Sequence, residues 1–255
     1  MADHTAGGRA PAPGRRAPSA GGPPGTAARP DGQAHQPCLA GMSLRDIIEA
    51  QAGNDTVFGQ SGDDRIDGGR GNDFLAGDGS CSGRTAPGTN DPAYSEDCTT
   101  RTNEGNDRIE GRDGNDRIVG GNGNDRLGGG SGRDNISAGA GRDRVSGGNG
   151  RDRLAGGSEN DRISGGAEND KIFGGGGNDF MSGGSGNDDI RGGGGNDVII
   201  GGGGTDNISA GAGNDRIRAR DGQRDRVTCG SGRDVVLADR FDRVGRSCER
   251  VLRRR

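Results

Sequence analysis

The sequence predicts an all-β repeat protein, a solenoid of short strands joined by glycine-rich turns. Between Glu104 and Ile217 an aspartate stands at every ninth residue, and an apolar residue follows two positions after each one. Glycine provides 58 of the 255 residues, and it dominates the positions just before the aspartates. An internal repeat this regular determines the architecture before any other feature does.

Each nonapeptide has the form G-G-x-G-x-D-x-U-x, where U is apolar, as in the segment GGNGNDRL at 120–127. The first six residues should form a tight turn, because glycine alone adopts positive φ freely. Asn or Asp before the aspartate tolerates the left-handed region better than most residues. The last three residues should form a short strand, with U pointing inward and both neighbours pointing outward.

This nonapeptide resembles the calcium-binding repeat of the hemolysin-type, or repeats-in-toxin (RTX), family. The resemblance extends over 53–237 in about eighteen copies. It implies a right-handed parallel β-roll in which two nonapeptides make one coil and calcium lies in the turns between stacked coils. The expected calcium ligands are the repeat aspartates, Asp55, Asp64, Asp73, Asp107, Asp116, Asp125, Asp134, Asp143, Asp152, Asp161, Asp170, Asp179, Asp188, Asp197, Asp206, Asp215, Asp225 and Asp234.

The spacing of these carboxylates suits calcium. In coils of two nonapeptides Asp107 stacks on Asp125, and Asp116 stacks on Asp134, with neighbouring strands ~4.8 Å apart. Calcium–oxygen bonds are about 2.3–2.6 Å long, so one ion fits between two carboxylates and turn carbonyls complete its shell. Without metal the column is a ladder of like charges that resists stacking. Because only 26% of the residues are apolar, we expect the fold to need this metal.

Changes in composition and period divide the chain. Residues 1–37 form a Pro/Ala/Gly-rich tail that is expected to be disordered. Residues 38–52 form an N-terminal cap, with a short helix over 43–50 for which Ser43 is the N-cap. The β-roll occupies 53–237, and 238–255 form a C-terminal cap and a basic tail. Within the β-roll, 79–103 are an insertion in a single turn, since removing them restores the period of nine.

The cysteines indicate the redox environment in which the protein works. Cys81 and Cys98 lie in the insertion, where they form either a disulfide or two free thiols, and a Cys229–Cys248 disulfide would hold the C-terminal cap. Cys38 is left over. Two disulfides fit an oxidising compartment. We therefore expect a secreted, extracellular protein, although neither an export signal nor a membrane span is visible in the sequence.

Two kinds of departure occur inside the array. Glu159 and Glu168 replace the fourth-position glycine, where they either strain the turn or add a carboxylate. Arginines replace the usual Asn before the aspartate in three successive turns. These arginines either compete with calcium electrostatically or point to solvent, and they are Arg133, Arg142 and Arg151.

The sequence predicts no enzyme. Both histidines, His4 and His35, lie in the tail, and no Ser-His-Asp, Cys-His, G-x-S-x-G or phosphate-loop pattern occurs. A secreted calcium-binding module with a structural or surface-interaction role fits best, with calcium as its cofactor. An ice-binding solenoid would need regular rows of Thr or Asn on the outer strands, and these rows are absent.

The alternative function is binding of an anionic polymer, such as a glycan or lipid headgroups, with calcium as the scaffold. The residue after each aspartate points outward, so one sheet carries a basic row that binds anionic polymers non-specifically. No specific nucleic-acid partner is expected. The competing interpretation is a solvated face that Asp67 and Glu110 partly neutralise. The row consists of Arg108, Arg126, Arg144 and Arg162, with Arg65 if the insertion keeps the register. The opposite sheet carries a weaker, mixed row, Arg117, Asn135, Arg153, Lys171 and Asp189.

Overall fold

The computed structural model describes residues 39–40, 45–50, 52–60, 62–78, 80–81, 98–99 and 105–253. The predictions for the tail at 1–37, for Cys38 and for Ser43 lie outside these residues, as does most of the insertion. Every regular element of the described chain is a β-strand. None of the described residues belongs to a helix that is long and apolar enough to cross a membrane.

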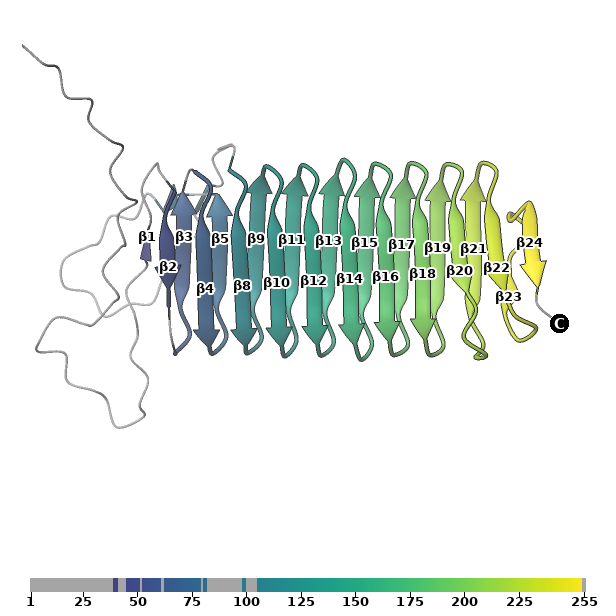
Figure 1. The fold of residues 1–255 in the computed structure, drawn as a ribbon, viewed down its shortest axis with the longest axis horizontal. Helices are drawn as coiled ribbons and strands as arrows, with labels where there is room; N and C mark the ends of the chain where they lie inside the picture. The colour runs from purple at the N-terminus through teal and green to yellow at the C-terminus, as the bar shows by residue number, and fades with distance from the viewer. Residues whose placement is uncertain are drawn as a thin grey trace, which may run out of the picture.

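The strands build two parallel sheets of eleven strands each, which face each other along an elongated solenoid (Figure 1). The chain alternates between the sheets, so the order within each sheet follows every second strand. Sheet A contains, in order, β1 (Leu39–Ala40), β3 (Thr56–Gln60), β5 (Phe74–Asp78), β9 (Arg117–Asn122), β11 (Asn135–Ala140), β13 (Arg153–Ser158), β15 (Lys171–Gly176), β17 (Asp189–Gly194), β19 (Asn207–Ala212), β21 (Arg226–Ser231) and β23 (Arg243–Val244). Sheet B contains β2 (Ile47–Glu49), β4 (Arg65–Arg70), β8 (Arg108–Asp113), β10 (Arg126–Ser131), β12 (Arg144–Asn149), β14 (Arg162–Ala167), β16 (Phe180–Ser185), β18 (Val198–Gly203), β20 (Arg216–Ala219), β22 (Val235–Ala238) and β24 (Arg250–Arg253).

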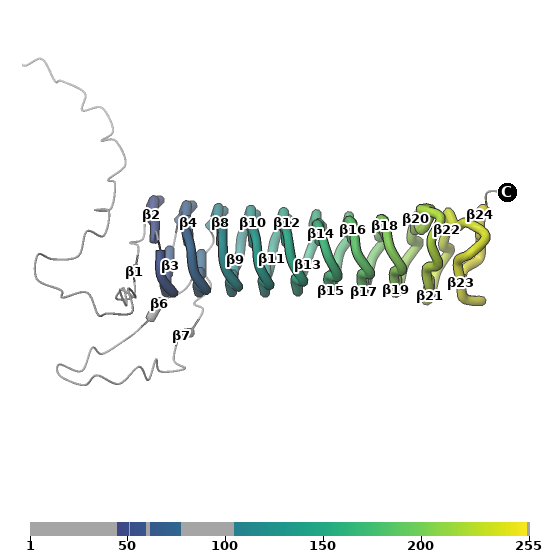
Figure 2. The backbone as a smooth tube through the Cα atoms, turned by 90° about the horizontal axis from the view of Figure 1, so that it is seen from below, coloured from purple at the N-terminus to yellow at the C-terminus, as the bar shows by residue number. Residues whose placement is uncertain are grey.

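The register confirms the predicted coil of two nonapeptides. Arg126 pairs with Arg144, and Asn135 pairs with Arg153, each eighteen residues on. Figure 2 shows the backbone climbing one coil at a time along the axis. Arg65 pairs with Arg108, 43 residues on, so the register leaves room for 25 extra residues between these two coils. Part of that segment forms a small antiparallel pair, β6 (Ser80–Cys81) and β7 (Cys98–Thr99). This backbone pairing sets Cys81 opposite Cys98, but their side chains lie outside the description.

The core is thin and repeats with the coils. The U residue of each nonapeptide points inward and is buried, as Ile118, Val145 and Met181 show at 0–3% exposure. Two residues later the chain points inward again, with glycine at most coils and a small residue such as Ala138 or Ala210 at others. Facing sheets can therefore approach closely, because one branched side chain and one small residue fill each half-coil.

The strands are longer than the sequence suggested. Most contain six residues rather than three, because pairing between coils continues through the glycine pair, as Gly148 and Gly166 show. The turn itself is confined to the fourth, fifth and sixth positions. Its glycine has positive φ, 124° at Gly150, and a Cβ there would overlap with the carbonyl oxygen of Gly132 in the neighbouring coil. Glycine is therefore required both for the turn and for the close stacking of coils.

Both ends of the solenoid continue the repeat. The predicted helix at 43–50 is wrong, because Ile47–Glu49 form strand β2, which pairs with β4 and buries Ile48. At the C-terminal end, the predicted Cys229–Cys248 disulfide is present. It joins β21 to the segment between β23 and β24, so it fastens the last coils together.

Candidate metal centre

Every aspartate that the sequence singled out lies in one of two buried columns, one for each sheet. Each aspartate is the last residue of a turn, directly before a strand, and is only 1–3% exposed to solvent. Aspartates of one column are neighbours in consecutive coils. The columns exist because the period of nine, applied twice, returns the chain to the same edge of the solenoid. Burial of so many carboxylates needs compensation, since an uncompensated buried charge is strongly destabilising.

At every predicted position except Asp55, one oxygen of the carboxylate accepts a hydrogen bond in the fold. The backbone N–H of Asp143 donates to Oδ1 of Asp161 at 2.9 Å, and the N–H of Asp161 donates to Oδ1 of Asp179 at 2.9 Å. The same bond recurs in the other column, where the N–H of Asp152 donates to Oδ1 of Asp170. Each carboxylate therefore reaches back to the preceding coil and fixes the stacking of the turns.

The second oxygen is buried and accepts no hydrogen bond from any described residue at most of these positions. A buried acceptor without a donor costs about 1–3 kcal/mol, and more when it is charged. Such an orphan repeated along both columns points to a ligand that binds oxygen. The orphan atoms are Oδ2 of Asp55, Asp73, Asp107, Asp116, Asp134, Asp143, Asp152, Asp161, Asp170, Asp179, Asp188, Asp197, Asp206, Asp215, Asp225 and Asp234.

The space in front of this oxygen suits a cation. The glycine five residues before the aspartate leaves room there: a Cβ added to Gly156 would overlap with Oδ2 of Asp161 and lie 2.7 Å from the carbonyl oxygen of Gly174. A carboxylate oxygen and a carbonyl oxygen of the next coil thus converge on the space that the missing side chain leaves. Hard cations such as calcium prefer this all-oxygen donor set.

Side chains alone do not complete a metal cage. No group of three or more His, Cys, Asp or Glu side chains with metal-binding geometry occurs in the described part of the chain. Each turn supplies one carboxylate, so the remaining ligands of an ion must be backbone carbonyls. That requirement fits calcium, which accepts backbone oxygens, better than zinc, which prefers Cys and His.

Burial makes the column aspartates hold their protons more firmly than exposed aspartates do. Burial raises the pKa of Asp134, Asp161 and Asp170 to about 7, and the charges of neighbouring aspartates in the same column add to this effect. Hydrogen bonds from the backbone lower these pKa values but do not offset burial. Burial also raises the pKa of Asp197 and Asp225 to about 7. These are carboxylates that need a counter-charge in order to stay ionised near neutral pH.

Three further residues extend the columns beyond the predicted set. The N–H of Asp46 donates to Oδ1 of Asp64, the N–H of Asp225 donates to Oδ1 of Asp242, and the N–H of Asp234 donates to Oε2 of Glu249. Asp46 could have been found from the sequence, because it stands nine residues before Asp55 and an apolar residue follows two positions later. Glu249 gave no such signal, since it breaks both the period and the residue type.

The three arginines that replace the usual Asn before the aspartate face solvent, which is one of the two interpretations of these positions. Arg133, Arg142 and Arg151 are exposed, and Arg151 lies 3.7 Å from the carboxylate of Glu168. They interrupt an amide ladder on the turns, in which the Asn at this position accepts the N–H of its equivalent one coil later. Asn124 accepts the N–H of Arg142 at 2.9 Å, but arginine offers no acceptor to the next coil.

Glu159 and Glu168 have both of the effects that the sequence left open. Their φ angles are 74° and 75°, in the left-handed region that favours glycine. Their charges also raise the pKa of nearby column aspartates, Asp161 in one case and Asp170 in the other. Each glutamate therefore strains its turn and adds negative charge beside a column.

The outer arginine row of sheet B is a second candidate site. Strand pairing places its members side by side, and Arg65 keeps the register across the insertion. Near its N-terminal end Arg108 pairs with Glu110 at 3.3 Å, whereas Asp67 pairs with Arg112, which is not a member of the row. Among the described residues, no carboxylate lies within 4 Å of the guanidinium groups further along the row. These unpaired members are Arg126, Arg144 and Arg162.

The mixed row on sheet A has the predicted register and different surroundings. Its arginines are engaged with aromatic rings: Arg117 lies over Phe74 at 5.5 Å and Arg153 lies over Phe173 at 4.7 Å. The row also carries Asp189, which pairs with Arg191 at 3.1 Å. The unpaired positive charge is therefore concentrated on sheet B.

The sequence matches the family model described as RTX calcium-binding nonapeptide repeat (4 copies). The matches cover 41–75, 101–136, 128–163, 155–190 and 182–217, which is more than half of the chain. They do not test the count of eighteen repeats, which stays a prediction. No curated protein matches the sequence. Among solved structures, a hyperactive, Ca²⁺-dependent, β-helical antifreeze protein from an Antarctic bacterium is 22% identical, with 84% of this chain and 82% of that chain covered and a TM-score of 0.33.

Proposed function

Because this chain belongs to the family of RTX calcium-binding nonapeptide repeat proteins, we propose that its buried aspartate columns hold calcium and that calcium drives the solenoid to fold. The observation that carries this proposal is the buried Oδ2 atom without a donor, repeated along both columns. We propose every predicted aspartate as a ligand, together with carbonyl oxygens of the turns.

The chain's own residues would perform three tasks around the ion. The carboxylates supply negative charge, and their Oδ1 bonds to the preceding coil hold Oδ2 in place. The glycines let the coils approach closely enough for carbonyls of consecutive turns to converge. Calcium, when bound, neutralises the repulsion within each column. Each site at tenfold excess of calcium over its Kd adds about 1.4 kcal/mol to the free energy of unfolding.

The role that follows is structural and extracellular rather than catalytic. Extracellular calcium-binding modules bind at about 10⁻⁴–10⁻³ M, so a chain of this kind stays unfolded where calcium is scarce and folds where it is abundant. The Cys229–Cys248 disulfide supports an oxidising compartment. The proposed protein is therefore secreted and becomes rigid outside the cell.

A calcium titration followed by far-UV circular dichroism tests this proposal. We expect little β signal in excess chelator and a cooperative gain of β signal as calcium rises. Magnesium serves as the control, since it is smaller and gives up its waters reluctantly, and it should restore little of the signal. A native-like β signal that persists in excess chelator would contradict calcium-driven folding.

We also propose a second function, binding of an anionic polymer along sheet B. The observation that favours it over a neutralised face is the shortage of acidic partners: Glu110 pairs with Arg108, and Asp67 pairs with Arg112 outside the row. Among the described residues, no carboxylate forms an ion pair with Arg126, Arg144 or Arg162. The opposite sheet supplies the control. We expect the triple change of Arg126, Arg144 and Arg162 to Gln to abolish retention on an anionic polysaccharide column with calcium present. Changing Arg117 and Arg153 to Gln should have little effect, and equal loss for both sets would contradict the proposal.

A further inference from the structure

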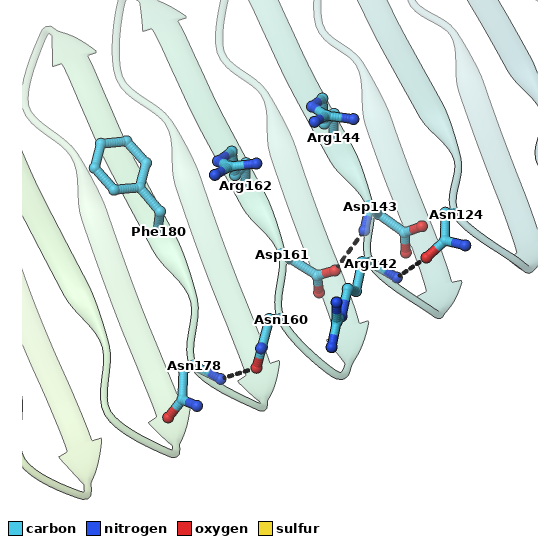
Figure 3. A pocket seen from close by; sticks show the side chains of 9 residues that line it. All are labelled: Asn124, Arg142, Asp143, Arg144, Asn160, Asp161, Arg162, Asn178 and Phe180. Carbon is cyan, nitrogen blue, oxygen red and sulfur yellow. Dashed lines mark hydrogen bonds between the residues drawn. The ribbon is translucent and has the colours of Figure 1, made fainter.

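A hollow of about 550 Å³ opens on the outer face of sheet B, where the basic row meets the turns (Figure 3). It is lined by guanidinium groups of the row, by the turn arginine, by turn amides, by one aromatic ring and by two column aspartates, Asp143 and Asp161. The residues that matter are Arg142, Arg144, Arg162, Asn160, Asn178 and Phe180. The hollow therefore combines positive charge, hydrogen-bond donors and an apolar surface, beside two aspartates whose charge bound calcium would neutralise.

Phe180 continues the arginine row, since it pairs with Arg162 of the preceding coil. Its side chain is exposed at 41% although it is large and apolar. All five phenylalanines lie within the described residues, and the rings of four contact another aromatic ring or a guanidinium group. Phe58 and Phe74 contact each other, and guanidinium groups lie over Phe74, Phe173 and Phe241. Phe180 has neither kind of contact, so its ring offers a free face beside the unpaired arginines.

Hydroxyl and amide groups run parallel to this row. Ser146, Ser164 and Ser182 are paired in register on the same outer face of sheet B, two residues after the row positions. On the turn side, Oδ1 of Asn160 accepts the N–H of Asn178 at 2.6 Å. Among the described residues, neither of these two asparagines uses its NH₂ group in a hydrogen bond. A ligand that extended from the hollow across the charged row would thus meet donors and acceptors on both sides of it.

We propose that this hollow is a binding subsite for an acidic polysaccharide, a chain of sugar rings that carry carboxylate or sulfate groups. Arg144 and Arg162 would bind the acidic groups, because guanidinium forms paired hydrogen bonds with such oxyanions. Phe180 would stack on the C–H face of a sugar ring, and the serines and asparagines would bind its hydroxyls. The proposal rests on the anionic-polymer function of the row and specifies its ligand.

The same surface fits single-stranded nucleic acid less well. Proteins that bind single strands stack successive bases on successive aromatic rings. This row has one ring only: its neighbours in the register are Arg162 on one side and Val198 on the other. A single stacking ring among cations and hydroxyls fits a hydroxylated, charged sugar chain better than a run of bases.

Binding of the full chain in saturating calcium to three immobilised polyanions tests the subsite. The probes are polygalacturonate, which carries carboxylates, dextran sulfate, which carries sulfates, and polyphosphate, which has no sugar ring. We expect Phe180→Ala to weaken binding to at least one glycan about five- to tenfold and to leave polyphosphate binding unchanged. Arg144→Gln should weaken binding to all three and reduce the dependence on salt. Phe241→Ala, which removes an equally exposed ring (43%) outside the row, is the matched control.

The outcomes separate the subsite from the functions on which it rests. Loss of glycan binding in Phe180→Ala alone supports it, and the affected glycan identifies the acidic group. If Phe180→Ala and Phe241→Ala behave alike, the subsite is wrong although the basic row stands. If the parent protein binds no polyanion while calcium still induces β structure, the row and subsite both fail and calcium binding survives. Tighter binding of single-stranded oligonucleotide than of either glycan, weakened by Phe180→Ala, would overturn the choice of ligand.

Discussion

At the scale of single residues, a column aspartate such as Asp161 links two coils and leaves one oxygen for a cation. Its Oδ1 accepts a backbone N–H from the preceding coil, and its Oδ2 faces the gap left by an inward glycine. Asparagine keeps an Oδ1 acceptor and removes the charge, so Asp→Asn separates the structural bond from metal binding. The Oδ1 hydrogen bonds join aspartates of the same column, eighteen residues apart. The stacking of aspartates within a column can therefore be tested by comparing pairs within one column with pairs across the two columns.

We expect Asp161→Asn to weaken calcium binding at the two sites that it shares with Asp143 and Asp179. In a double-mutant cycle its coupling to Asp143→Asn should be about 0.5–3 kcal/mol, as for residues in contact. Its coupling to Asp152→Asn, in the other column, should be near zero. Calcium titrations of the single and double variants measure both terms. Stronger coupling to Asp152 than to Asp143 would show that the coil does not stack these residues.

At the scale of elements, the nine-residue period predicted the coils, the inward residues and the outer rows correctly. The prediction was wrong at 43–50, where the N-cap and helical spacing were weighted above the nine-residue period. The segment at 43–50 has a good N-cap and helical spacing, yet Asp46 and Ile48 continue the repeat and form β2. Pairing of Ile48 with Ile66 in the next coil decides the outcome, and such long-range pairing overrides local propensity.

Other features of the elements could not be read from the sequence. The length of each strand depends on backbone pairing between glycines of consecutive coils. Glycine has no side chain whose apolar or polar pattern could reveal this pairing in the sequence. Which aspartate oxygen is satisfied depends on the relative height of consecutive turns. The partner of Asp67 also depends on contacts between coils, since Asp67 pairs with Arg112 in the following coil rather than with the basic row.

The turn ladder gives a prediction at this scale. Asn124 accepts the N–H of Arg142 at 2.9 Å and Asn160 accepts the N–H of Asn178 at 2.6 Å, but arginine interrupts the ladder between them. Arg142→Asn should restore the missing acceptor for Asn160 and raise the free energy of unfolding by about 0.5–1.5 kcal/mol in calcium. Urea unfolding measures the change. Arg144→Asn, on the outer face two residues later, is the control and should not stabilise; no gain from Arg142→Asn would contradict the ladder's importance.

At the scale of the whole molecule, stability comes from contacts between consecutive coils. Each coil buries two branched side chains and little else, whereas ordering each residue costs about 1–2 kcal/mol of backbone entropy. Contacts of this nearest-neighbour kind make folding propagate along the axis. Stacking each further coil adds charged aspartates to both columns. The protonation of these aspartates and their binding of metal therefore affect the stability of the whole solenoid.

This dependence on protonation predicts opposite effects of pH on the calcium-free fold and on calcium binding. Burial raises the pKa of Asp134, Asp161 and Asp170 from 3.8 to about 7 in the calcium-free fold. A carboxyl whose pKa is higher in the folded chain stabilises it fully below the unfolded pKa and loses that contribution as pH rises through the folded pKa. In chelator, the β signal should therefore grow as pH falls below about 7. Calcium binds the ionised form, so the affinity of the folded chain for calcium should fall over the same range. Circular dichroism in chelator at a series of pH values measures the first trend, and calcium titrations of the folded chain over the same range measure the second. A calcium affinity of the folded chain that is independent of pH would contradict the assignment of these aspartates as ligands.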